Sequence, residues 1–169
     1  VAADTAAKLI SVAGQVSAAI GERGIAAGMT WAENKLDNTT GAYMRGVDLK
    51  GYNNGTTSLI VDAQNNSRTW AVAVGAGVST GYAAAEGAAA KTTGKNDTEA
   101  VVEKYPTKSN TINNAGSSQV QATDNTIEKT VAGSIGVAAG QKAMASIGGA
   151  VAYTSVGNSG TDKQKVRAE

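Results

Sequence analysis

Carboxylates, glycines and aromatic rings are the groups that could do chemistry in this sequence, because histidine and cysteine are both absent. Without them the chain lacks the usual ligands of zinc and copper and the commonest general base. Asp97, Glu99 and Glu103 are close enough in sequence to bracket a sugar, as paired carboxylates do in glycoside hydrolases. They lie in a polar stretch that we expect to be solvated, with no accompanying cluster of Asp, Lys and Arg. The sequence therefore predicts no catalytic residues and argues against an enzyme.

Residues 74–81 have the glycine spacing of a dinucleotide-binding loop, with Gly75, Gly77 and Gly81 after an apolar run. Two other segments of similar sequence lack these glycines at the same places. We therefore interpret the three glycines as structural and expect no cofactor-binding residues. The glycine- and aspartate-rich nonapeptide that binds Ca²⁺ in some parallel β-helices is also missing. We therefore expect no metal site.

Three aromatic residues, Trp31, Trp70 and Tyr153, could form a surface on which sugars stack. The two tryptophans replace aliphatic residues in an alternating pattern. We therefore expect them to be the widest parts of a thin core or to cover one end of it, which is the more ordinary role for such residues.

Charge and composition exclude several classes of protein. The 15 basic and 14 acidic residues leave a net charge of +1, and the basic residues are dispersed, which argues against nucleic acid as a partner. No signal peptide opens the sequence and no apolar run of about 18 residues occurs, so we expect no membrane span within it. With 21 Gly and no Phe, any core must be thin and built from small side chains.

A sequence repeat of 59 to 60 residues organises the secondary structure that would position the carboxylates, glycines and aromatic residues. Val12 matches Val72 and Val131, and the residues around them match as well. A fixed period of this size is typical of stacked folds in which each unit buries its apolar face against its neighbours. We interpret residues 1–169 as one segment excised from a larger repeat protein, with units at 1–60, 61–119 and 120–169.

Within each unit one segment alternates between aliphatic and small residues with a period of two, which predicts a β-strand. These segments are residues 10–20, 70–79 and 131–138. A helix beginning near Asp4, and a second over residues 82–91, are the competing interpretation. The glycines at 75, 77, 133 and 136 favour strands, because each costs a helix interior about 1 kcal/mol relative to alanine.

Polar segments at residues 38–41, 96–99 and 158–161 are interpreted as turns. Turns every 20 residues or so predict an all-β parallel β-helix, a solenoid with about 20 residues per coil and three coils per repeat. We expect the aliphatic residues to face inward. Val72→Asp should then destabilise the fold more than Ala73→Ser, because it would bury an unpaired charge.

Three stretches resemble the repeats of filamentous haemagglutinins and leukotoxin-like large adhesins of Gram-negative bacteria. They are residues 120–127, residues 130–140, and residues 147–153 with 156–158. The resemblance implies a right-handed β-helical passenger, exported by a type V route such as two-partner secretion. It also implies an extracellular or cell-surface location and a role in virulence.

The partners that the resemblance implies are a host-cell or matrix receptor, neighbouring repeats of the parent protein and an outer-membrane transporter. The expected function is that of a structural segment in a filamentous adhesin. Two alternatives stay open: the head region of a trimeric autotransporter adhesin, and an alanine-rich helical interaction module.

Overall fold

The computed structural model describes residues 1–50, 57–104, 106–107, 111–113, 115–140, 145–157 and 165–168. Every regular element in these residues is a β-strand. The strands are β1 (Ala2–Thr5), β2 (Lys8–Ala19), β3 (Ile25–Arg45), β4 (Asp48–Lys50), β5 (Thr57–Asn65), β6 (Arg68–Ser79), β7 (Ala83–Glu103), β8 (Thr111–Asn113), β9 (Ala115–Asp124), β10 (Ile127–Ala138), β11 (Ala145–Val156) and β12 (Lys165–Ala168). The all-β prediction is confirmed, and the helices considered near Asp4 and over residues 82–91 are strands instead.

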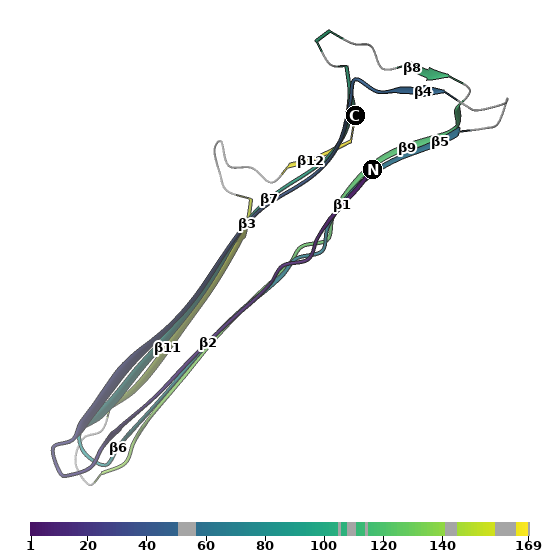
Figure 1. Ribbon diagram of the computed structural model, residues 1–169. Coiled ribbons are helices and arrows are strands. Elements are labelled where there is room, and N and C mark those ends of the chain that lie inside the picture. The colour runs from purple at the N-terminus through teal and green to yellow at the C-terminus, as the bar shows by residue number, and fades with distance from the viewer. Residues whose placement is uncertain are drawn as a thin grey trace.

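The strands form four parallel sheets. Sheet A contains β1, β5 and β9; sheet B contains β2, β6 and β10; sheet C contains β3, β7, β11 and β12; sheet D contains β4 and β8. Each repeat follows sheets A and B in one direction and returns along sheet C, so that two long layers face each other (Figure 1). This arrangement of parallel strands in stacked sheets is compatible with a β-helix-like solenoid.

The register shows that each repeat contributes one strand to each layer. Val12 pairs with Val72, and Val72 pairs with Val131, at separations of one full repeat. The predicted coil of about 20 residues is therefore wrong, because strand neighbours in sheets A, B and C are some 60 residues apart. Each additional repeat would raise the stack by only about 4.8 Å, the spacing of neighbouring strands.

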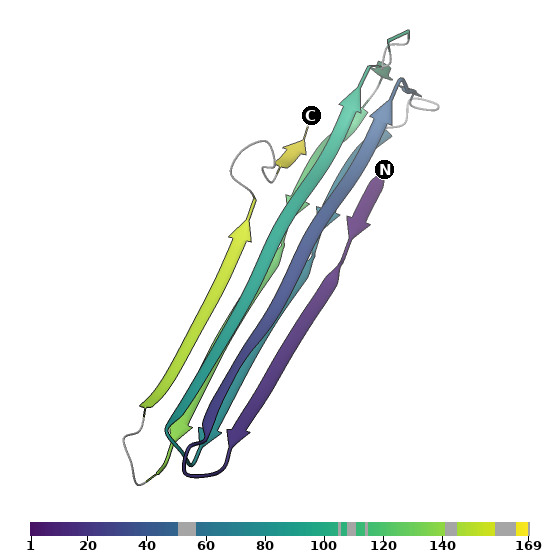
Figure 2. The ribbon, with the colours of Figure 1, turned by 90° about the vertical axis from the view of Figure 1, so that its left-hand side faces the viewer.

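The long dimension of the molecule runs along the strands and not along the stack (Figure 2). β3 and β7 each contain 21 residues, which is about 70 Å at the rise of an extended chain. The predicted turns at residues 38–41 and 96–99 lie inside these two strands, and residues 158–161 lie outside the described residues. Thr39, Thr40 and Thr98 explain part of this error, because β-branched residues favour strands.

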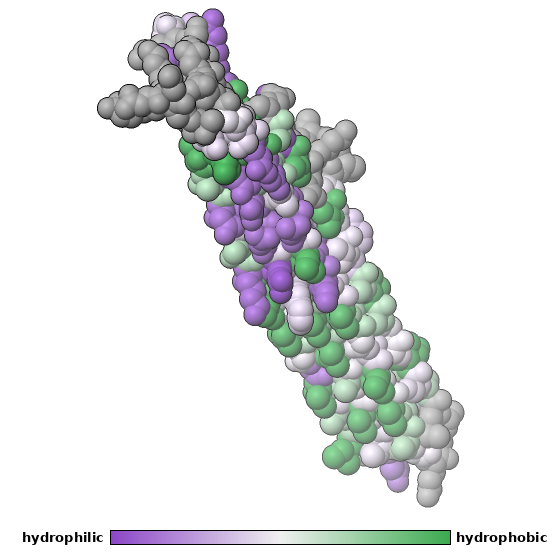
Figure 3. Space-filling view, turned by 90° about the vertical axis from the view of Figure 1, so that its right-hand side faces the viewer, coloured by the Kyte–Doolittle hydropathy of each residue, from purple (hydrophilic) through white to green (hydrophobic). Residues whose placement is uncertain are grey.

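The alternating faces point the opposite way from the prediction. In β6 the small residues Ala71 and Ala73 are fully buried, whereas Trp70, Val74 and Val78 are about half exposed. The aliphatic residues of β2 and β10 also lie on the outside, and Figure 3 shows them as the green lower half of one face. The expectation of an aliphatic interior is wrong, and with it the expected effects of Val72→Asp and Ala73→Ser.

The interior side chains are small because the two layers approach closely. Asn34 Nδ2 donates to the Trp70 carbonyl at 2.6 Å, and Ser134 Oγ donates to the Gly149 carbonyl at 2.8 Å, so side chains of one layer reach the backbone of the other. A Cβ on Gly136 would stand 2.9 Å from the carbonyl oxygen of Ile147. Valine or isoleucine at such positions would force sheets B and C apart, so in sheet B these residues face outward.

The described part of the chain forms two apolar clusters in the interior. One is made of alanines between sheets B and C: Ala32, Ala71, Ala73, Ala88 and Ala90. The other lies between sheets A and C and includes larger side chains: Ala42, Met44, Leu59, Val61, Ala63 and Ala100. Polar residues fill the space between the clusters.

Three glycines with positive φ follow the ends of β2, β3 and β11. Gly21 has φ 133°, Gly46 φ 59° and Gly157 φ 68°, values that L side chains rarely adopt. In the turn between β2 and β3, the amide of Gly24 donates to the carbonyl of Gly21 at 3.1 Å and closes the turn.

Candidate functional site

The carboxylates singled out in the sequence lie on the outer face of β7 and pair with neighbouring strands. The hydroxyl of Tyr43 donates to Glu99 Oε2 at 2.8 Å, and Glu103 forms an ion pair with Arg45. The hydrogen bond to Glu99 raises the pKa of Tyr43. Asp97 lies on the same face and pairs in register with Thr39 of β3. These contacts are those of cross-strand pairs that stabilise a sheet.

Gly75 and Gly77 lie beside a buried carboxylate, whereas Gly81 lies against the backbone of Gly24. Glu86 of β7 is only 4% exposed and points between the layers, where the hydroxyl of Ser17 donates to its Oε1. A Cβ on Gly77 would stand 2.6 Å from Glu86 Cγ, and one on Gly28 would stand 2.7 Å from Glu86 Oε1. The glycine spacing therefore makes room for an internal side chain, which supports the structural interpretation.

A hydrogen-bonded polar band crosses the interior between the two apolar clusters. Asn38 Nδ2 donates to Ser67 Oγ at 2.8 Å, and Ser67 Oγ donates to Asn65 Oδ1 at 2.6 Å. One repeat further on, Asn96 Nδ2 donates to Thr126 Oγ1 at 2.7 Å. Asn38 and Asn96 are neighbours in register, so their amides stack from one repeat to the next. Buried polar groups that are paired in this way fix the register of the layers.

Glu128 is the charged residue at the edge of this band. It faces inward from β10, and burial, followed by the charge of Asp124, raises the pKa of its carboxyl. Neither carboxylate oxygen has a hydrogen-bond partner among the residues that the structure describes. A Cβ on Gly94 would overlap Glu128, so glycine again accommodates an internal carboxylate.

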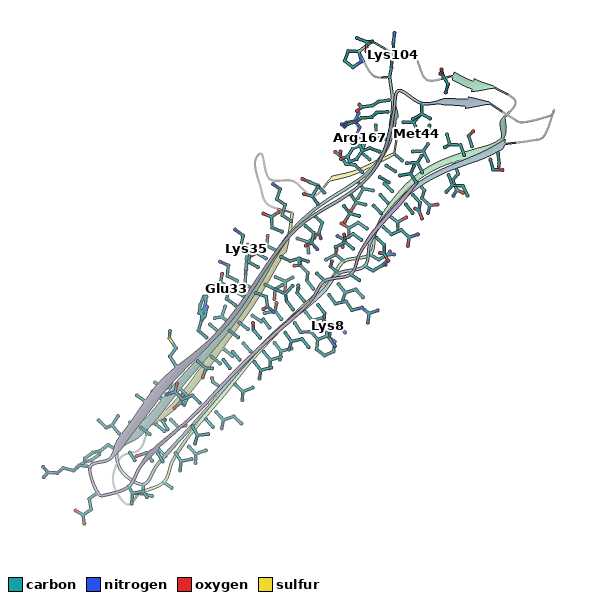
Figure 4. All side chains as sticks on the ribbon, in the orientation of Figure 1. Lys8, Glu33, Lys35, Met44, Lys104 and Arg167 are labelled. Atoms are coloured by element: carbon teal, nitrogen blue, oxygen red, sulfur yellow. The ribbon has the colours of Figure 1, made fainter. Side chains whose placement is uncertain are left out.

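A hollow of about 610 Å³ lies on the outer face of sheet C. Lys35 and Lys95 line it, together with the ion pair between Glu33 and Lys91, whose charged atoms are 3.0 Å apart. The hydrogen bond and the charge of Lys91 lower the pKa of Glu33. Figure 4 shows Glu33 and Lys35 projecting outward from β3. Tyr153 lines the same hollow, so a ring and several charged groups meet at one open place.

The three aromatic residues do not form one stacking surface. Trp31 is on the outer face of sheet C, at 53% exposure, and Trp70 is on the outer face of sheet B, at 46%. The prediction that they belong to a thin core is wrong. Tyr153 shares the sheet C face with Trp31, whereas the ring of Trp70 lies under the ammonium group of Lys129 at 5.2 Å.

An apolar surface on sheet B was missed from the sequence, because the alternation reveals two faces without saying which is outside. We call it the aliphatic face. It consists of Ile10, Val12, Gly14, Val16 and Ala18 of β2, Trp70, Val72, Val74, Ala76 and Val78 of β6, and Lys129, Val131, Gly133, Ile135 and Val137 of β10.

Neither a metal site nor a membrane-spanning helix occurs within the described ranges. No group of three or more acidic residues there could hold a metal ion. No helix in the same residues has the length and hydropathy of a membrane span. Comparison with family models, curated proteins and solved structures found no match to this chain.

Proposed function

We propose that the chain is a structural repeat segment of a secreted or surface-exposed filamentous adhesin, folded as a right-handed parallel β-solenoid with one coil per 60-residue repeat. The observation that carries the proposal is the unbroken register of three successive repeats over sheet B, in which Val12, Val72 and Val131 stand side by side. Figure 2 supports the handedness, since the chain ascends the near layer, descends the far one and advances from β3 to β7 to β11.

The ends of the stack support a role within a longer array. β2 and β10 are the edge strands of sheet B, so each presents unpaired backbone groups that another coil can join. Stacked repeats that contact only their neighbours form extended structures whose length is set by repeat number. Because each repeat adds about 4.8 Å, the fibre would be broad for its length.

The resemblance to filamentous haemagglutinins and leukotoxin-like adhesins supplies the cellular context of this proposal. In that context the partners are neighbouring repeats, a type V transporter during export and a host-cell or matrix receptor. The hollow around Lys91 and Tyr153 is the surface that we assign to receptor contact, because it combines an exposed ring with several hydrogen-bonding side chains.

Antibodies raised against the chain provide the test. They are expected to label intact producing cells without permeabilisation and to reduce attachment of these cells to host monolayers. Labelling only after lysis would rule out a surface location. Normal attachment in the presence of saturating antibody would rule out the adhesive role.

A further inference from the structure

We propose that the aliphatic face is a dimerisation surface whose occupant is a second copy of this chain. The inference goes beyond the adhesin proposal and does not depend on it. It begins from the finding that the large aliphatic side chains of sheet B lie outside: Val12 is 73% exposed, Val16 78% and Ile135 66%.

The aliphatic face is continuous and almost uncharged. In-register pairing places Val12, Val72 and Val131 in one row across the three strands. Lys129 is its one charged member, at a corner of the face and engaged with the Trp70 ring. Lys8 and Arg68 follow at one end and form a polar border. An apolar centre with a polar border is the usual anatomy of a protein interface.

The shape of the face suits a second copy of itself. Val74 stands in the middle strand between Gly14 and Gly133, its partners in register. A Cβ on Gly133 would have no atom within 4 Å, and one on Gly14 would have only the Val74 carbonyl oxygen at 4.0 Å. Each face therefore offers a projecting valine and two open positions, so that two copies related by a two-fold axis can place Val74 of one over a glycine of the other.

The exposed area is sufficient for such an interface. The chain exposes 10034 Å² for a mass of 16.9 kDa. Monomeric proteins of this mass expose about 7,700 Å², which leaves an excess of roughly 2,300 Å². A standard stable interface removes about 800 Å² from each partner. The aliphatic face contributes to the excess of the whole chain through side chains such as Val12, Val16 and Ile135, at 73%, 78% and 66% exposure. Face-to-face packing of two sheets at about 10 Å would bury the aliphatic side chains without altering either fold.

Other occupants fit the face less well. A strongly charged partner would find only Lys129 on the face itself to complement it, and that ammonium group already lies over the Trp70 ring. A lipid bilayer that took sheet B into its hydrocarbon core would also enclose β2 and β10, edge strands whose unpaired backbone groups are not tolerated there. A second copy leaves these edges in water.

The test compares the association of the wild-type chain with two lysine variants by sedimentation velocity over the micromolar range. The wild type is expected to form dimers. Val74→Lys places a charge at the centre of the aliphatic face and should raise the dissociation constant roughly tenfold or more. Met29→Lys is the matched control, because Met29 is 72% exposed on the outer face of sheet C and its variant should dimerise like the wild type.

Far-ultraviolet circular dichroism checks that each variant is folded, and Val74→Ser, which removes the projecting branched side chain without adding a charge, replaces Val74→Lys if the latter does not fold. A wild type that stays monomeric would overturn the proposal, as would a folded Val74 variant that dimerises normally. A dissociation constant raised as much by Met29→Lys as by Val74→Lys would overturn the choice of face. Binding of monomeric wild type to phosphatidylcholine vesicles, lost in the Val74 variant, would identify lipid as the occupant instead.

Discussion

Ala89 and Ala90 provide a matched pair for testing which side of the strands is buried. They are consecutive residues of β7 with the same side chain. Ala90 is 2% exposed and belongs to the alanine cluster, whereas Ala89 faces outward between Trp31 and Val151 in register. Neither belongs to the aliphatic face, so dimerisation does not enter the comparison.

Replacing each with aspartate should give very different losses of stability. At position 90 the carboxylate would be buried among alanines without a partner, which costs about 3–5 kcal/mol. At position 89 it would meet solvent, and the change should stay within about 1 kcal/mol, the range of strand propensity. For a chain of this length, these values correspond to a fall in melting temperature of about 6–20 °C for Ala90→Asp and at most about 4 °C for Ala89→Asp.

Thermal unfolding followed by circular dichroism at neutral pH measures both values in parallel. Acidification provides an internal control, since protonation of the carboxylate introduced by Ala90→Asp should restore part of the lost stability. Equal melting temperatures for the two variants, or a larger loss for Ala89→Asp, would refute the assignment of small residues to the interior.

Three further predictions concern the internal and outer charges. Because the pKa of Glu128 is raised, the native state binds its proton more tightly than the unfolded chain, so stability should fall as pH rises through that pKa. Glu128→Gln should remove this loss; an unchanged pH profile of denaturant midpoints would contradict the burial of the carboxyl. Gly77→Ala should destabilise by about 1–3 kcal/mol through overlap with Glu86, and Glu86→Ala should rescue it in a double-mutant cycle. No coupling between the two would place them apart. Lys91→Met should raise the pKa of Glu33 towards its ordinary value in an NMR titration, and an unaltered value would show that the ion pair is absent.

Much of the fold could be predicted from the repeat and the period-two alternation. Residues 10–20, 70–79 and 131–138 lie in strands almost throughout, and their glycines correctly argued against helices. The repeat also predicts which strand pairs with which in a sheet, as the pairs Val12 with Val72 and Val72 with Val131 show.

The length of the coil and the direction of the faces could not be predicted in the same way. Residues 38–41 have the composition of a turn, yet Asn38 points inward and donates to Ser67, so the chain stays extended there. Alternation is symmetric with respect to inside and outside. The distance between the layers decides which face is buried, and a buried Glu86 between Gly28 and Gly77 shows how that distance selects small residues.

The candidate sites were less accessible to sequence analysis. The hollow beside Glu33 brings together residues of β3, β7 and β11 that are far apart in the chain. One signal was available: Glu33 and Tyr153 are placed opposite Lys91 once the 60-residue register is applied to β7.

The most direct test of the central claim is a disulfide between residues one repeat apart. The natural chain has no cysteine, so Val12→Cys and Val72→Cys can be combined without background. The two positions are paired in register on neighbouring strands, and a spacing of about 4.8 Å is within reach of a disulfide.

Coils of about 20 residues would place the same two positions three strands apart, about 14 Å, which no disulfide spans. Mild oxidation of the double variant, followed by mass spectrometry of the monomer, should give an intramolecular link between residues 12 and 72. Its absence, together with a link in the matched pair Val12→Cys and Ala32→Cys, would contradict the stack of 60-residue coils.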